Sequence, residues 1–180
     1  SPFGHCFASF HVKAPIFVAR QLVKHKFLRW NEISRRYVDD DPEFYVPDVW
    51  RGRSEDKKQG SDDTVSIDVA WYDRDDGYNS WPEDSCFIAL EAYQKMLEVG
   101  VAREVARAVL PVATYSSMYV TMNARALMNF LSLRTAREGS HFPSYPQREI
   151  EMVAEKMEAE FAKLMPLTYG AFEKSGRIAP

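Results

Sequence analysis

Residues 21–37 read QLVKHKFLRWNEISRRY, and this stretch decides how the rest of the sequence is interpreted. Glu32 is its single carboxylate. Its cationic side chains, counted with the neighbouring Arg20, are Arg20, Lys24, Lys26, Arg29, Arg35 and Arg36. The whole chain has a formal net charge of -3, so this stretch is a basic island in an acidic protein. A local excess of positive charge attracts anions, and we expect the island to bind one.

Length and composition set the class of protein. With 180 residues, 46% of them hydrophobic, the chain can bury a core, and we expect a single domain over 1–180. The two cysteines, Cys6 and Cys86, are too few for a disulfide framework and indicate a reducing, cytoplasmic environment. No apolar run is long enough for a membrane span and the first residues do not resemble a signal peptide, so we expect no membrane partner.

The hydrophobic pattern predicts an α+β fold. Strands are expected over 7–12, where apolar and polar residues alternate, and over 115–121, which is rich in β-branched and aromatic residues. Pro15 is suited to open a helix that leads to the basic island, and the island then lies at the helix end and in the loop beyond it. Helical spacing predicts further helices over 83–100, 101–110, 124–133 and 147–164. The apolar faces of the first and last of these are Phe87, Leu90, Tyr93 and Leu97, and Ile150, Val153, Met157, Phe161 and Leu164.

Residues 38–82 differ from the rest of the chain. They contain the runs DDDPEF, GRSEDKKQGSDD and RDDGYNSWP, which are rich in charge and in turn-forming residues. We interpret them as a loop-rich excursion with little regular structure.

Several common sites are excluded by the absence of their motifs. The glycines form neither GxGxxG nor a Walker loop, so side chains must bind any phosphate. The four histidines show no paired ligand spacing, and no metal is expected. Ser34 lacks the GxSxG setting of a hydrolase nucleophile. Judged without any motif, Ser34 is more readily interpreted as a helix cap, and Arg107 fits an ordinary solvated helix face equally well.

The basic island carries a family resemblance. Lys24, His25 and Lys26 are followed by seven residues and then Ser34, which is similar to the RHRxxSxNExSxRY signature of flavin-dependent thymidylate synthases. Asn31, Glu32, Arg36 and Tyr37 also fall in register with that signature. Two later blocks, EVARAVLP over 104–111 and NARALMNFLSLR over 123–134, resemble the same family in order and spacing.

The resemblance implies a fold and a reaction. The fold would be α+β, with an antiparallel sheet flanked by helices, in a homotetramer whose active sites lie at subunit interfaces. The reaction would convert dUMP to dTMP, with 5,10-methylenetetrahydrofolate as one-carbon donor, FAD as redox carrier and NADPH as reductant. No enzyme cysteine would act as nucleophile. Family members carry residues ahead of the position of Ser1, including a histidine that helps bind FAD, so the chain is expected to lack the family's N-terminal part.

The resemblance also implies roles for individual residues. Arg134 and Ser34 would be catalytic, with Arg134 stabilising negative charge on the pyrimidine. The residues expected to bind FAD are Ser1, Lys24, His25, Lys26, Asn31, Glu32, Asn123, Arg125 and Asn129. The residues expected to bind dUMP are Gln21, Glu32, Ser34, Arg35, Arg36, Arg107 and Arg134.

This sequence departs from the family in its cations. Lys24 and Lys26 replace arginines, and because lysine lacks the planar fork of arginine, we expect weaker contacts to the FAD phosphates. Arg29 stands where the family usually has serine, and we hypothesise that it compensates.

Two alternative functions stay open at this point. One is a related flavoenzyme that modifies another pyrimidine nucleotide or stops at a hydroxymethyl product. The other is a non-catalytic nucleic-acid-binding module that uses the basic island. Against the module, the protein is acidic overall and the island is not interleaved with an aromatic platform, so no nucleic-acid partner is expected.

Overall fold

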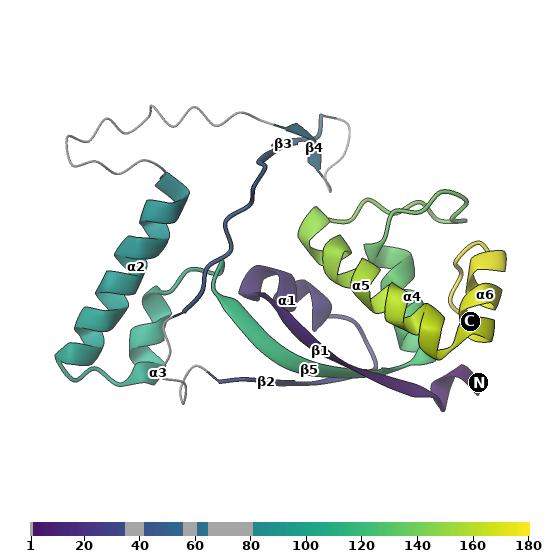
Figure 1. Ribbon diagram of the computed structural model, residues 1–180, viewed down its shortest axis with the longest axis horizontal. Helices are drawn as coiled ribbons and strands as arrows, with labels where there is room; N and C mark the ends of the chain where they lie inside the picture. The colour runs from purple at the N-terminus through teal and green to yellow at the C-terminus, as the bar shows by residue number, and fades with distance from the viewer. Residues whose placement is uncertain (1, 35–41, 56–60, 65–80) are drawn as a thin grey trace.

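The computed structural model describes residues 2–34, 42–55, 61–64 and 81–180. Its centre is a three-stranded antiparallel sheet (Figure 1). β5 (Tyr115–Asn123) lies in the middle, between β1 (Phe7–Pro15) and β2 (Leu28–Glu32). The predicted α+β class and antiparallel sheet are confirmed.

Alternation along the strands gives the sheet one apolar face. Val12 lies opposite Met118 and Phe10 lies opposite Val120, and directly opposite residues of antiparallel strands point to the same side. The residues buried on that side include Ala8, Val12, Ala14, Leu28, Met118, Val120 and Met122. Burying this face against helices supplies the main stabilisation of the fold.

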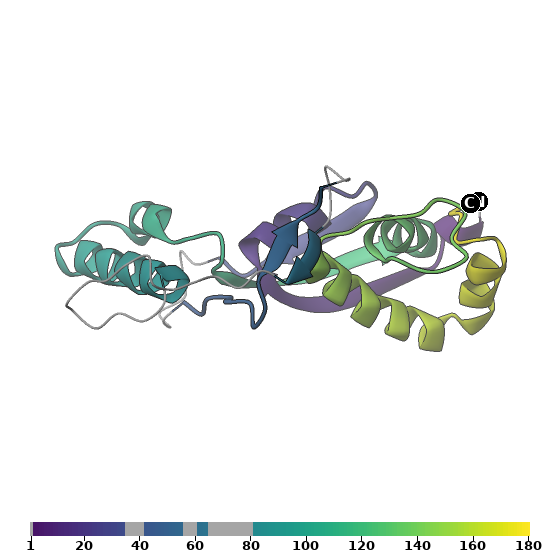
Figure 2. The same ribbon diagram turned by 90° about the horizontal axis from the view of Figure 1, so that it is seen from above.

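The described helices that pack on the sheet lie on its apolar face (Figures 1 and 2). They are α1 (Ile16–Leu22), α4 (Ala124–Arg134), α5 (Arg148–Leu164) and α6 (Pro166–Lys174). Their buried side chains, such as Leu22, Leu131 and Phe161, join the strands in one hydrophobic core. A 3-10 turn, η1 (Pro2–Gly4), precedes β1. No described helix is long and apolar enough to cross a bilayer.

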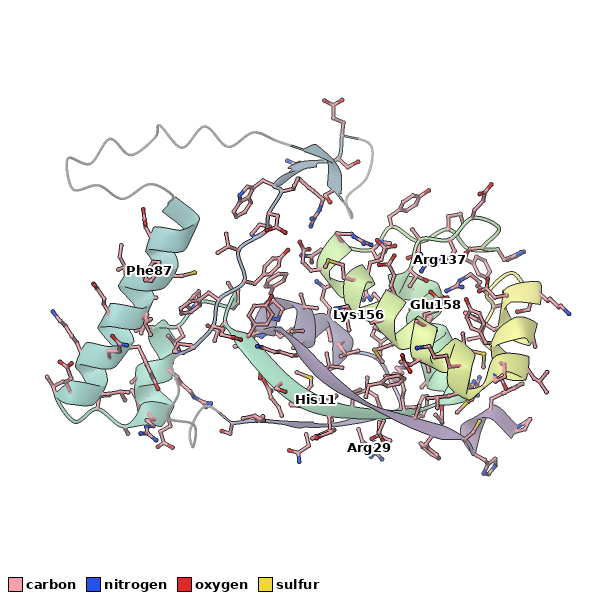
Figure 3. The ribbon with its side chains drawn as sticks, viewed as in Figure 1. His11, Arg29, Phe87, Arg137, Lys156 and Glu158 are labelled. Carbon is pink, nitrogen blue, oxygen red and sulfur yellow. The ribbon has the colours of Figure 1, made fainter. Side chains whose placement is uncertain are left out.

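The other side of the sheet is polar, and we call it the open face. Ser9 and Thr121 share a hydrogen bond of 2.7 Å there, and His11 bonds to Ser117 at 2.6 Å. Arg29 pairs with Thr121 in the register and points away from the helices (Figure 3).

A second group of helices lies beyond the end of the sheet (Figure 1). α2 (Trp81–Glu98) packs against α3 (Arg103–Ala106) and the 3-10 turn η3 (Arg107–Val109). The apolar face predicted for α2 is only partly right. Tyr93 is buried, whereas Phe87 is 61% exposed and the neighbouring Cys86 is buried instead.

Three further predictions need correction. The residues predicted as a loop after the first helix include strand β2, which forms because its backbone pairs with β5. Leu164, placed on the apolar stripe of the last helix, is 63% exposed because α5 ends there and α6 follows. The excursion contains two short paired strands, β3 (Arg51–Arg53) and β4 (Ser61–Thr64). Much of the rest of 38–82 lies outside the described residues.

Candidate active site

One cavity lies at the end of β2, and we call it the β2 cavity. Its volume is about 400 Å³. β2 contributes Asn31 and Glu32, the chain just beyond β2 contributes Ser34, and η3 contributes Arg107. Four residues predicted to bind ligands thus meet at one cavity, although Arg107 is distant from the others in sequence.

Hydrogen bonds orient the polar groups of the β2 cavity. Ser116 on β5 donates from Oγ to Oε1 of Glu32. Arg107 is exposed, and its Nε donates to the backbone oxygen of Glu104 at 3.3 Å. An arginine and a serine hydroxyl at one cavity suit a phosphate or another anion.

A second cavity lies at the start of α4, and we call it the α4 cavity. It has a volume of about 550 Å³. Its lining residues are Gly4, Lys26, Phe27, Asn123, Arg125, Ala126, Asn129, Ala179 and Pro180. Four residues predicted to contact the flavin, Lys26, Asn123, Arg125 and Asn129, are therefore brought together here.

Local structure explains how the α4 cavity is formed. Asn123 caps α4, because its Oδ1 accepts the backbone N–H of Ala126 at 2.8 Å. Arg125 and Asn129 are four residues apart in α4 and both are exposed, so they lie on one side of the helix. Phe27 has a φ of 61°, a left-handed conformation that is uncommon outside glycine, and it turns the chain from α1 into β2. This turn carries Lys26 to the cavity.

The last residue of α4 contacts the basic island. Nε of Arg134 donates to Nε2 of His25 at 3.1 Å, and the His25 ring packs edge-on against Phe130, with the centroids 4.9 Å apart. Burial and, secondarily, the Arg134 charge lower the pKa of His25 from 6.5 to about 4. Burial also lowers the pKa of Arg134. His25 is therefore neutral near pH 7, with its proton on Nδ1.

The remaining predicted residues lie elsewhere. Gln21, at the end of α1, donates from Nε2 to Oε1 of Gln147 at 2.5 Å and does not line the β2 cavity. Lys24 is exposed near the end of α1. Ser1, Arg35 and Arg36 lie outside the described residues. Arg29 projects from β2 on the open face and does not line the α4 cavity, which gives no support to the compensation hypothesis.

Two of the arginines predicted to bind dUMP, Arg107 and Arg134, lie in different parts of the chain. Ser34 and Arg107 line the β2 cavity, whereas His25 and Arg134 lie at the junction of α1 and α4. In Figure 1 the elements α3 and α4 are on opposite sides of α1. Among the described residues, Arg107 lines the β2 cavity, whereas Arg134 lines neither the β2 cavity nor the α4 cavity.

Sequence reasoning missed some of the lining residues. Ser116 reaches Glu32 because β5 and β2 pair with Met118 opposite Glu32, and the sequence carries no signal for that register. Ala179 and Pro180 reach the α4 cavity from the other end of the chain, since the two termini lie side by side (Figures 1 and 2). No group of three or more potential metal ligands occurs in the described ranges.

Comparisons with known proteins agree with the motifs. The family model described as "Thymidylate synthase complementing protein" matches residues 1–167. The chain is 52% identical to a flavin-dependent thymidylate synthase of Streptomyces avermitilis, covering 100% of this chain and 72% of that protein. It is 45% identical to one from Tropheryma whipplei, covering 100% of this chain and 74% of that protein.

Solved structures give the same result for the fold. PolB from Streptomyces cacaoi, a UMP/dUMP methylase bound with 5-Br UMP, matches with a TM-score of 0.87 and 45% identity. The match covers 100% of this chain and 78% of PolB. The resemblance seen in the three sequence blocks is confirmed, and this chain belongs to the flavin-dependent thymidylate synthase family of enzymes.

Proposed function

We propose that this enzyme catalyses the reductive methylation of dUMP to dTMP, with methylenetetrahydrofolate as one-carbon donor and NADPH as reductant. The observation that carries the proposal is the β2 cavity, where Glu32, Ser34 and Arg107 converge from separate parts of the chain. These are the positions at which the family motif predicts nucleotide ligands.

The α4 cavity fits the phosphates of FAD. Lys26 and Arg125 supply positive charge, and the N-terminal end of α4 adds the partial positive charge of its backbone N–H groups. Asn129 and the Asn123 amide can hydrogen-bond polar groups of the cofactor. Bound FAD would supply the hydride and one-carbon chemistry, while the protein supplies orientation.

Arg134 is proposed to act on the pyrimidine. Because neutral His25 is its hydrogen-bond partner, the guanidinium charge is not cancelled by that contact. An uncancelled cation can stabilise negative charge that develops on the uracil ring as C5 becomes nucleophilic. Ser34 and Arg107 would hold the 5′-phosphate.

The cysteines are proposed to have no part in catalysis. Cys86 is buried in α2, and Cys6 is half-buried with its Sγ 4.0 Å from the backbone oxygen of Phe3. Neither thiol lines the β2 or the α4 cavity. This arrangement is compatible with methylation that needs no enzyme thiolate.

A homotetramer is proposed because the ligands of one nucleotide are divided between two places in each chain. Arg107 belongs to the β2 cavity and Arg134 to the α1–α4 junction. If the β2 cavity of one subunit faces the α1–α4 junction of another, both arginines reach the same dUMP.

A second substrate is favoured by one comparison. PolB is described as a UMP/dUMP methylase, and its structure was obtained with 5-Br UMP. We therefore infer that UMP is the competing substrate to test for this chain. Membership of an enzyme family argues against a non-catalytic nucleic-acid-binding module.

An anaerobic titration tests the proposal. FAD-loaded protein is reduced with NADPH and then mixed with methylenetetrahydrofolate and either dUMP or UMP, while flavin reoxidation and methylated product are followed. We expect reoxidation coupled to dTMP formation. Product from UMP at a higher kcat/KM than from dUMP would transfer the assignment to ribonucleotide methylation. Protein that neither binds FAD nor forms methylated product would overturn the proposal.

A further inference from the structure

The residues that follow α4 make a set of polar contacts that have no role in the proposed chemistry. Each of the three residues after Arg134 bonds to a charged side chain. Arg177 donates from Nη2 to Oγ1 of Thr135 at 2.8 Å. The N–H of Ala136 donates to Glu151 at 2.8 Å, and Nη2 of Arg137 lies 2.9 Å from Oε2 of Glu158. We call these contacts, with the Arg177–Glu158 ion pair, the exit clamp.

The centre of the exit clamp is buried. The side chains of Arg177 and Glu158 are 3% and 6% exposed, and Nη1 of Arg177 lies 2.6 Å from Oε1 of Glu158. Tyr169 also donates to Glu158, at 3.2 Å. Figure 3 shows Arg137 and Glu158 side by side between the helices. Burying two charges costs solvation free energy, and apolar residues in the same place often stabilise a core at least equally well. Stability alone therefore does not explain the buried Arg177–Glu158 pair.

The clamp fixes the last turn of α4. The Thr135 hydroxyl accepts from Arg177 and donates to the Leu131 oxygen at 2.7 Å, and the Thr135 N–H bonds to the same oxygen at 3.0 Å. On the other side of Arg134, the Leu133 oxygen accepts from Ser144 Oγ at 2.7 Å. The backbone is therefore held immediately before and immediately after Arg134.

The clamp also pairs two carboxylates of α5 with arginines other than Arg134. Glu158 is engaged by Arg177 and Arg137, and Glu155 lies within 3.5 Å of Arg137. Among the ion pairs found in the described ranges, none involves Arg134. Within the described part of the chain, the Arg134 side chain makes one hydrogen bond, to His25. A single hydrogen bond does not fix the orientation of the guanidinium group by itself.

We propose that Arg177 and Glu158 are positioning residues, which act through Thr135 to hold the Arg134 guanidinium against His25. The geometric part of this proposal stands on the contacts alone. Its catalytic part rests on the proposed function, in which Arg134 faces the pyrimidine.

Thr135→Val tests the link with little change in shape, because valine matches threonine but cannot bond to Arg177. Thr135→Ser is the conservative partner that keeps the hydroxyl. Lys163→Met is the control. It removes the exposed Lys163–Glu160 ion pair from α5, the helix that also carries Glu158. Circular dichroism and thermal melting establish that all three variants fold.

The first readout needs neither substrate nor activity. NMR titration of His25 reports whether Arg134 stays beside it, because the Arg134 charge contributes to the low pKa of the ring. We expect the His25 pKa to rise in Thr135→Val and to stay at the parent value in Thr135→Ser and Lys163→Met. An unchanged His25 pKa in a folded Thr135→Val variant would overturn the proposal.

The second readout is kinetic. We expect Thr135→Val to lower kcat with dUMP on the order of tenfold with a smaller change in KM, because misplacing a catalytic group slows the chemical step more than binding. In an Arg134→Lys background the same change should have little further effect, since the two residues act as a unit. If the losses in kcat from Thr135→Val and Arg134→Lys instead multiply, Thr135 acts independently of Arg134 and its role is merely structural. If the parent protein forms no product, the proposed function fails, and the His25 titration still decides the geometric part.

Discussion

Arg134 and His25 form a cation–neutral pair: Nε of the arginine donates to Nε2 of the imidazole at 3.1 Å, and the histidine stays uncharged. The two residues come from different family blocks and meet because α1 and α4 pack on the same face of the sheet. A carboxylate in the place of His25 would bind the guanidinium more firmly and would cancel its charge. The pair therefore holds Arg134 while leaving its positive charge uncompensated.

The charge of Arg134 can be tested directly. We expect Arg134→Ala to retain FAD, because Arg134 does not line the α4 cavity, and to lose kcat by on the order of 100-fold or more. Steady-state dTMP formation and flavin absorbance measure the two effects. Lys174→Met removes an exposed cation at the end of α6 and should change neither. Near-normal turnover of Arg134→Ala would exclude a role at the pyrimidine.

His25 predicts how stability depends on pH. The pKa of His25 is lowered from 6.5 to about 4 in the folded protein, so the unfolded chain takes up its proton first as the pH falls. Stability from this group is complete above about pH 6.5 and is lost as the pH falls toward 4. We expect a loss of about 1–2 kcal/mol, after allowing for solvent screening of a partly exposed ring. Urea unfolding measured between pH 7 and pH 4 should show this loss in the free energy of unfolding in the parent and in His5→Asn. The loss should be much smaller in His25→Asn. Equal pH slopes in parent and His25→Asn would contradict this.

Ser116 and Ser117 make a matched pair of variants. Ser116 points toward the helices and bonds to Glu32, whereas Ser117 bonds to His11 on the open face. We expect Ser116→Ala to raise KM for dUMP roughly three- to tenfold, the worth of one hydrogen bond that orients Glu32. Ser117→Ala should leave KM unchanged. Equal effects of the two changes would mean that the Ser116–Glu32 contact does not serve the nucleotide.

FAD affinity distinguishes the expected role of Lys26 from that of Arg29. Lys26 lines the α4 cavity, so we expect Lys26→Ala to weaken FAD binding about tenfold, as for loss of one charge-assisted hydrogen bond. Arg29 lies on the open face, and Arg29→Ser should bind FAD as well as the parent does. Fluorescence titration with FAD measures both. Weaker binding by Arg29→Ser would revive the idea that Arg29 compensates for the lysines.

The sequence predicted the apolar elements and the motif blocks, and it failed where pairing decides the structure. β1, β5, α1, α4 and α5 were expected because their periodicity reflects burial against the core. β2 was missed because it is a short, charged edge strand whose conformation comes from pairing with β5. The motif predicted Arg107 and Arg134 as ligands of one nucleotide, but their positions in different parts of the chain follow from tertiary packing, which no local pattern encodes.

The segment 42–54 offers a last test, because it crosses from the region of β5 to the start of α5. Its backbone pairs with the chain around β5, through Tyr45 N–H to the Ala113 oxygen at 2.9 Å. At α5, Glu149 accepts from Arg51 Nη2 at 2.5 Å and from Tyr45 Oη at 3.1 Å. Glu149 is 8% exposed, so removing its cation leaves a buried charge without an ion-pair partner among the described residues.

We expect Arg51→Met to destabilise the protein by about 2–4 kcal/mol, below the full value for a buried pair because Arg51 is 27% exposed. Burial, together with the Glu149 carboxylate, raises the pKa of Tyr45 to about 12, and Arg51 opposes that rise. Lys13→Met is the matched control: it breaks the exposed Lys13–Glu43 pair, which ties the same segment to β1, and should cost less than about 0.5 kcal/mol. Denaturant unfolding at pH 7 compares the two variants. Equal losses would mean that Glu149 does not anchor the segment through Arg51.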